Sequence, residues 1–324
     1  MSDRYPQLLR TPARRWWKPL VGVLLAAFTV VVASIAVVLA ATAVAAVLGA
    51  EDPFSDEALS ADTPVGLIAN NLAIATILPA VFIAVFAVHR ERVGRLSSVQ
   101  SRLRWPAAWR LFAVALALVL VFLAATVLVP PVGFGDVDVP PRGRLVALFA
   151  VILLTTPLQA AAEEYGFRGY LTQALCSWFP RAVTGTVVAA LVTAVLFALA
   201  HGAQDPWLFG DRLAFGLVAS WLAWRTGGLE AAIALHVANN LVSLGYSAAT
   251  GTLADSLTAS SLDWPFAVLD VTMMLVFAAV VDRLARRWRL TVRRVPDDQA
   301  GVPSAAGPGV LSGPPGVGYP DARS

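Results

Sequence analysis

The chain contains long apolar segments, each about as long as a helix that crosses a lipid bilayer. The first covers residues 20–48 without a charged residue, and seven more lie at 65–88, 107–129, 145–177, 183–201, 212–224, 229–248 and 264–281. Since ~20 apolar residues suffice for one crossing and 58% of the 324 residues are hydrophobic, we predict an all-α, polytopic membrane protein with about eight transmembrane helices. A cleaved signal peptide is the alternative for 20–48, but its apolar core would be only ~7–15 residues long, which favours a retained helix.

The loops between these segments alternate in charge. Residues 49–64 hold five acidic residues and no base, whereas residues 89–106 hold five arginines and the stretch after the last segment holds six. Short cytoplasmic loops of membrane proteins are enriched in Lys and Arg, so both termini are predicted to be cytoplasmic. The Ala- and Arg-rich composition with a single Lys is typical of a GC-rich bacterium, which predicts a multi-pass protein of the bacterial plasma membrane.

Charge and composition divide the chain into five parts. We predict a basic cytoplasmic tail (1–18), three N-terminal spans with their loops (19–142), a core of four spans around an intramembrane site (143–250), a last span with a basic flank (251–295) and a disordered tail (296–324). The last part is rich in Pro, Gly and Ser and has little to bury, which is the composition of disordered segments.

Three charged residues interrupt the apolar run at 145–179. A charge at the centre of a membrane helix costs roughly 2.5–3.5 kcal/mol on insertion scales, so such residues indicate a functional site. Glu164 and Arg168 are four residues apart on one helical face and can form an ion pair. Glu163 points about 100° away from that pair and is available for chemistry.

Histidine is scarce, with three in the chain. His89 adjoins Arg90 at the end of an apolar segment, where we expect a solvated role. His201 closes one apolar segment, and His236 is followed four residues later by Asn240, so these two side chains share a face. Taken singly, such residues can simply join helices by hydrogen bonds worth ~0.6 kcal/mol. Together with two carboxylates, they can activate water and hold an oxyanion.

The motifs EExxxR, FxxxH and HxxxN occur in this order at 163–168, 197–201 and 236–240. In this respect the sequence resembles the CAAX protease and bacteriocin-processing family, which includes type II CAAX prenyl endopeptidases and bacterial abortive-infection proteins. The resemblance covers about residues 145–248. It implies an intramembrane endopeptidase that acts on a membrane-associated or lipid-anchored substrate.

The resemblance also implies roles for individual residues. Glu163 would be the general base that activates water together with His201, and Glu164 would be held by Arg168. The oxyanion would then receive hydrogen bonds from His236 and Asn240. Whether a metal takes part is open: zinc or another divalent ion has a sufficient ligand set in Glu163, His201 and His236, and a reaction without any metal is equally consistent with these residue types.

Two other classes of function compete with the protease hypothesis. Glu and His chains inside membranes also form proton relays, which would suit a proton-coupled transporter. A non-catalytic immunity or scaffold protein could carry the same fold. For a protease, the expected partners are the lipid bilayer and a membrane-bound peptide or protein, with no nucleic acid. Bacteriocin maturation, immunity and cleavage of a membrane protein all fit, and oligomeric state is open.

The depth of His201 is a difficulty for the protease hypothesis, because the residue lies at the far end of its helix. Segment 212–224 is short for a full crossing at ~1.5 Å per residue. We therefore expect that it stops below the membrane surface, so that loop 202–211 sinks into the protein and brings His201 towards Glu163 and His236.

Overall fold

The computed structural model describes residues 4–55, 59–128 and 139–294, and within these ranges it contains helices and no β-strand. The α-helices are α1 (Lys18–Val47), α2 (Pro64–Ala75), α3 (Ile77–Ala84), α4 (Trp105–Leu128), α5 (Arg142–Glu164), α6 (Thr172–Cys176), α7 (Ala182–Leu199), α8 (Pro206–Thr226), α9 (Glu230–Thr250), α10 (Leu253–Leu257) and α11 (Trp264–Arg287). Four short helices of other types complete the set: the 3₁₀-helices η1 (Tyr5–Gln7) and η3 (Val93–Leu96), and the π-helices η2 (Val85–His89) and η4 (Tyr165–Leu171). The predicted tail at 296–324 lies outside the described residues.

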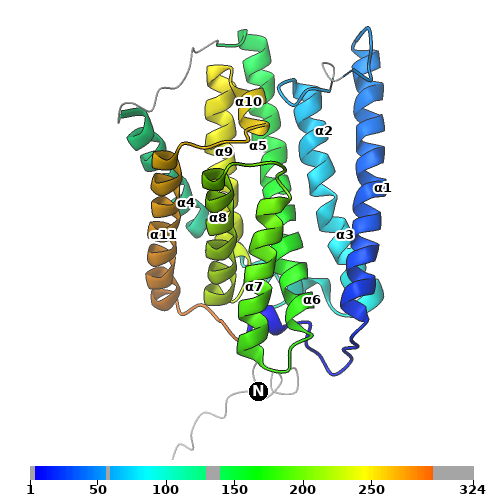
Figure 1. Cartoon of the computed structure of the whole chain (residues 1–324), viewed down its shortest axis with the longest axis vertical. Coiled ribbons are helices and arrows are strands. Elements are labelled where there is room, and N and C mark those ends of the chain that lie inside the picture. Colours follow the sequence, from blue (N-terminus) through cyan, green and yellow to red (C-terminus); the bar gives the residue numbers. More distant parts are fainter. Residues whose placement is uncertain (1–3, 56–58, 129–138, 295–324) are drawn as a thin grey trace, which may run out of the picture.

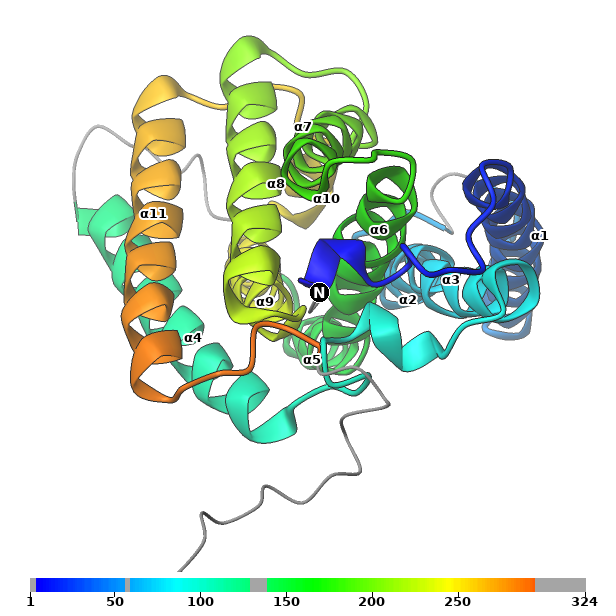
Figure 2. The same cartoon turned by 90° about the horizontal axis from the view of Figure 1, so that it is seen from below.

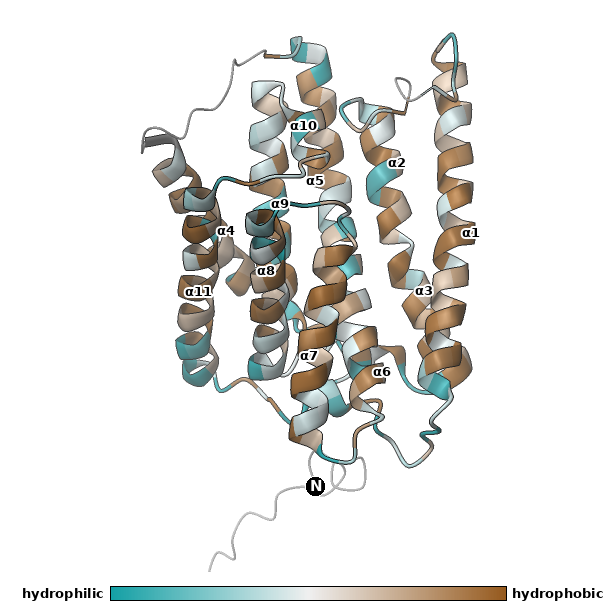
Figure 3. Cartoon of the chain, in the orientation of Figure 1, coloured by the Kyte–Doolittle hydropathy of each residue, from teal (hydrophilic) through white to brown (hydrophobic). Residues whose placement is uncertain are grey.

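The long helices stand side by side in one bundle (Figure 1). Helix α9 packs against α4, α5 and α8, whereas α1 contacts α2 and α3 at the edge of the bundle (Figure 2). Hydrophobic residues occupy most of the length of the outer helices, and many hydrophilic residues lie towards the helix ends (Figure 3). This pattern is what a bilayer requires of a helical bundle that crosses it.

Six helical rods within the described ranges are long and apolar enough to cross a membrane. They are Lys18–Val47, Pro64–His89, Trp105–Thr126, Arg142–Cys176, Ala182–Leu199 and Trp264–Arg287. Helices α8 and α9 have 21 residues each and run alongside them (Figure 1), but they carry more polar side chains. The all-α polytopic fold is therefore confirmed, and all eight predicted segments are helical.

The arginine-bearing loops come together at one end of the bundle, which we call the basic end. Backbone bridges join Arg4 to Arg293 and Ser98 to Gly228 there, and η1 lies across this end in Figure 2. At the opposite end, the Asp205 amide donates to the Ser260 carbonyl at 2.7 Å. The loops that the structure describes thus alternate between the two ends in the order that their charges predict.

The structure corrects the expected extent of segment 212–224. Helix α8 begins six residues earlier, at Pro206, where the Asp205 side chain accepts a hydrogen bond from the Leu208 amide at 2.7 Å. An Asp followed by Pro is a strong signal for the start of a helix. The charges of Asp211 and Arg212 lower the hydropathy of the segment, so a search for apolar segments does not include the first turns. The helix is therefore longer than expected. In Figure 1 the connection from α7 to α8 still lies below the upper ends of α5 and α9, so only the expected start of the helix is wrong.

A second correction concerns His89, which is buried rather than solvated. Its side chain lies at the end of η2 with 5% of its surface exposed. Its Nε2 atom is 3.1 Å from the Tyr170 hydroxyl, and the Lys18 ammonium donates to its carbonyl at 3.2 Å. His89 therefore ties the rod 64–89 to its neighbours.

Helices α7 and α8 approach closely at Gly216, where an added Cβ atom would lie 2.8 Å from the Ala194 Cα atom. We expect Gly216→Ala to destabilise the protein by about 1–3 kcal/mol, because the new methyl group would force the two backbones apart. Gly210 lies in the same helix with open space around it, so Gly210→Ala should be neutral or stabilising. Thermal unfolding in detergent measures both, and equal effects would contradict the close contact.

Candidate active site

The charged cluster lies where α5 passes into η4, near the centre of the bundle. Glu163 and Glu164 are the last residues of α5, and Arg168 follows within η4. Arg168 Nη1 donates to Glu164 Oε1 at 2.9 Å, and both side chains are fully buried. Removing either partner would leave the other as a buried charge without a counterion. The pair therefore stabilises the local conformation where α5 passes into η4.

His236 from the middle of α9 lies between the two carboxylates. Its Nδ1 atom is 2.8 Å from Glu164 Oε1, and its Nε2 atom is 3.3 Å from Glu163 Oε2. A neutral imidazole can donate from only one ring nitrogen. The shorter contact, with Glu164, is a hydrogen bond, whereas the 3.3 Å contact with Glu163 is an ion pair only when His236 is protonated.

The charges of this cluster can balance. A protonated His236 and Arg168 would carry two positive charges against the two negative charges of Glu163 and Glu164. A neutral cluster of this kind is far less costly inside a membrane than a single unpaired charge. In that state Glu163 remains a carboxylate and can accept a proton.

Gln159 connects Glu163 to Asn240 and was missed in the sequence. Its Nε2 atom donates to Glu163 Oε2 at 2.9 Å, and its Oε1 atom accepts from Asn240 Nδ2 at 3.2 Å. Because a carboxylate only accepts hydrogen bonds, the Gln159 amide must face Glu163 with its NH₂ group. Asn240 must then donate, and its second N–H remains available. The signal for Gln159 was its position one turn before Glu163 in an apolar helix.

An aromatic wall around Phe197 of α7 closes one side of the cluster. The Phe197 ring lies 4.2 Å from Arg168 Cζ, and its centroid is 5.4 Å from that of Phe215 and 6.0 Å from that of His236. A cation over an aromatic face is attracted by the ring quadrupole, most strongly when water is excluded. Phe197 belongs to the FxxxH motif, but its contact with Arg168 was not foreseen.

His201 packs against Phe197, one helical turn further along the chain. It follows the end of α7 in an exposed turn, with its Nδ1 atom 2.8 Å from the Phe197 carbonyl and its ring 4.8 Å from the Phe197 ring. No hydrogen bond or ion pair joins it to Glu163 among the described residues. The structure thus brings Glu163, Glu164, Arg168, His236 and Asn240 into one connected network, and His201 lies outside it.

A family model for Type II CAAX prenyl endopeptidase Rce1-like proteins matches residues 145–242. Residues 145–242 are therefore similar to an Rce1-like domain. The domain lies within the range 143–250 predicted as the core, and it contains the whole cluster together with the aromatic wall.

Relatives of the chain outside the family model are distant. An uncharacterized protein, YyaK of Bacillus subtilis (strain 168), is 26% identical over 192 residues, a match that covers 57% of this chain. The match spans 62% of YyaK, which is less than two thirds of its length. No solved structure matches the chain significantly.

Among the residues that the structure describes, the ligand set that the sequence left open for a metal is not assembled. In the part of the chain that the structure describes, no group of three or more His, Cys, Asp and Glu side chains is arranged to hold a metal ion. Of the expected ligands, His236 has both ring nitrogens against carboxylate oxygens, and His201 has its Nδ1 atom against the Phe197 carbonyl. We therefore derive no step through a metal.

Proposed function

We propose that this protein is an intramembrane endopeptidase that hydrolyses a peptide bond in a membrane-associated or lipid-anchored substrate with water activated by Glu163. The supporting observation is the division of labour between the two carboxylates. Glu164 is fully buried and paired with Arg168. The Glu163 side chain is 12% exposed, and its ion pair within the described residues is with His236. Glu163 is thus the carboxylate that water can reach.

In the proposed reaction, the Glu163 carboxylate takes a proton from a water molecule as its oxygen attacks the scissile carbonyl carbon. Protonation of Glu163 removes an acceptor from His236, so the Nε2–H group becomes available to the developing oxyanion. The second N–H of Asn240 provides another donor. The tetrahedral intermediate then collapses, the C–N bond breaks, and Glu163 returns its proton to the leaving amine.

His201 has a different place in this proposal from the one first expected. From its position against Phe197, its ring is suited to hold the substrate backbone or the incoming water rather than to contact Glu163 directly. The open side of the cluster therefore faces the end of α7.

We also propose that the basic end faces the cytoplasm of a bacterium, with the chain in the plasma membrane. Support comes from the arginines that gather at this end and from the acidic loops opposite, the distribution that the positive-inside rule describes. Both termini would then be cytoplasmic. Tags on the two loops 49–63 and 90–104, tested for protease access in intact cells, check this orientation.

Cleavage by the purified protein in liposomes tests the activity. Single-span substrate proteins, reconstituted as a library, are incubated with wild type and with Glu163→Gln, each with and without a chelator. We expect cleavage by the wild type alone, unaffected by the chelator. Loss with the chelator would replace the metal-free route by a metalloprotease, and equal inactivity of both proteins over a broad library would turn the search to proton-coupled transport.

Gln159→Met should remove both hydrogen bonds of Gln159 at nearly constant volume. We expect cleavage to fall roughly tenfold to a hundredfold, because Glu163 and Asn240 lose the link that fixes their separation. Leu158→Met, on the exposed neighbouring position, is the matched control. A purely structural role for Gln159 predicts instead that thermal stability falls while the pH dependence of cleavage keeps its shape.

A further inference from the structure

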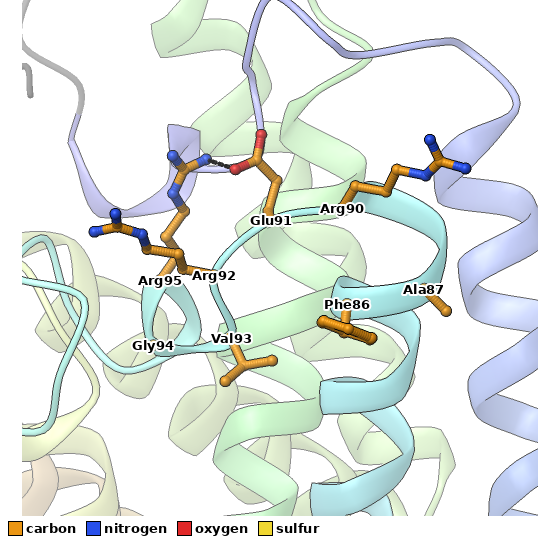
Figure 4. A pocket seen from close by; sticks show the side chains of 8 residues that line it. All are labelled: Phe86, Ala87, Arg90, Glu91, Arg92, Val93, Gly94 and Arg95. Carbon is orange, nitrogen blue, oxygen red and sulfur yellow. Dashed lines mark ion pairs between the residues drawn. The ribbon is translucent and has the colours of Figure 1, made fainter.

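A cavity of about 880 Å³ opens at the basic end, away from the candidate active site. Its lining comes from the end of the rod 64–89 and the loop that follows: Phe86, Ala87, Arg90, Glu91, Arg92, Val93, Gly94 and Arg95 (Figure 4). None of these residues belongs to the charged cluster or its aromatic wall. Pro64–His89 is long enough to cross a membrane, and the cavity lies at the end of this rod. A bilayer crossed by the rod would therefore end near the cavity.

The cavity carries an excess of positive charge. Arg95 forms an ion pair with Glu91, as Figure 4 shows. The exposed side chains of Arg90 and Arg92 make no hydrogen bond or ion pair with any residue that the structure describes. Two guanidinium groups therefore remain for an anionic ligand, and guanidinium groups bind phosphate well.

Apolar side chains adjoin these arginines. Phe86 is 73% exposed and Val93 is 36% exposed. In Figure 4 both side chains lie below the arginines. A small soluble anion would gain nothing from contact with these apolar side chains, whereas the acyl chains of a phospholipid can pack against them. Clusters of basic residues at the cytoplasmic edge of a membrane span recognise anionic lipids in this way.

The backbone around the cavity is held from two sides. Lys18 Nζ of α1 donates to the His89 carbonyl at 3.2 Å, and Gln173 Nε2 of α6 donates to the Arg95 carbonyl at 3.0 Å. The arginines therefore extend from a fixed loop, which reduces the entropy lost on binding.

From charge, depth and apolar lining together, we propose that this cavity binds the headgroup of an anionic phospholipid. The phosphodiester contacts Arg90 and Arg92, and the upper part of the acyl chains covers Phe86 and Val93. The site is independent of whether the protein cleaves peptides.

Native mass spectrometry of the full chain in neutral detergent tests the proposal, with phosphatidylglycerol and phosphatidylcholine added at increasing concentration. For the double variant Arg90→Gln, Arg92→Gln, we expect the dissociation constant for phosphatidylglycerol to rise roughly tenfold to thirtyfold. The control is Arg181→Gln, Arg287→Gln, which removes the same charge from exposed positions at the same end and should leave binding unchanged. Phosphatidylcholine should bind weakly to every variant.

The outcomes separate a lipid site from simpler explanations. An equal loss in both double variants would show only diffuse attraction by surface charge and would overturn the site, as would no loss in either. The water-soluble headgroup glycerophosphoglycerol provides another comparison. If it bound as tightly as the lipid, and if Phe86→Ser left lipid binding intact, the cavity would be a soluble phosphate site and the lipid assignment would be wrong.

Discussion

Replacing Glu163 with glutamine is expected to reduce cleavage by roughly 10²–10⁴-fold, the range for loss of a general base. Glutamine has the same shape and can still accept the hydrogen bond from Gln159, which is 2.9 Å away in the native protein. It cannot take a proton from water. The loss should therefore appear in the rate of the chemical step, with little change in the concentration of substrate needed for half-maximal rate.

Two comparisons make this test decisive. Glu51→Gln removes an exposed carboxylate from an acidic loop and should leave cleavage unchanged. The thermal stability of Glu163→Gln should stay close to that of the wild type, which separates lost chemistry from lost structure. Cleavage by Glu163→Gln at the wild-type rate would remove Glu163 from the proposed mechanism.

Arg168→Met should have the largest effect on stability. The substitution leaves the fully buried Glu164 carboxylate without its partner at 2.9 Å and removes the cation above the Phe197 ring. Breaking one partner out of a buried ion pair costs about 3–5 kcal/mol, mostly because the remaining charge is uncompensated. Denaturation in detergent micelles, followed by circular dichroism, measures this loss.

The origin of the loss can be checked with a second substitution. If the unpaired Glu164 charge causes the instability, Glu164→Gln together with Arg168→Met should recover a large part of it, as a double-mutant cycle would show. Arg225→Met breaks the ion pair with Asp282, whose side chains are about one-fifth exposed, so its cost should be at most about 1 kcal/mol. Equal costs for Arg168→Met and Arg225→Met would contradict the special burial of the first pair.

The fold was largely predictable because a bilayer imposes simple length and polarity rules on helices. All eight segments are helical, and their loops alternate between two ends of the bundle as the charges predict. The start of α8 was not found by hydropathy, since Asp211 and Arg212 lie inside the helix. The short-range signal at Asp205 and Pro206 would have placed it correctly.

Most residues of the site could be predicted from the sequence, but most of the contacts between their side chains could not. Spacing alone indicates the pair of Glu164 and Arg168, because four residues make about one helical turn. Spacing within one helix says nothing about which side chains meet across helices. The contact of His236 with both carboxylates, the link through Gln159 and the position of His201 relative to them all depend on packing between α5, α7 and α9.

The bridge between Arg4 and Arg293 brings two distant parts of the chain together. The helices could therefore be connected in a different order along the chain and still pack in the same way. A short linker from residue 4 to residue 293 would make the chain circular without moving a helix. Cutting that chain between Gly251 and Trp264 would then place both new termini at the end of the bundle opposite the basic end. Circular permutation of this kind succeeds where ends are close and exposed. Such a permuted chain would offer two attachment points for reporters on the face opposite the basic end.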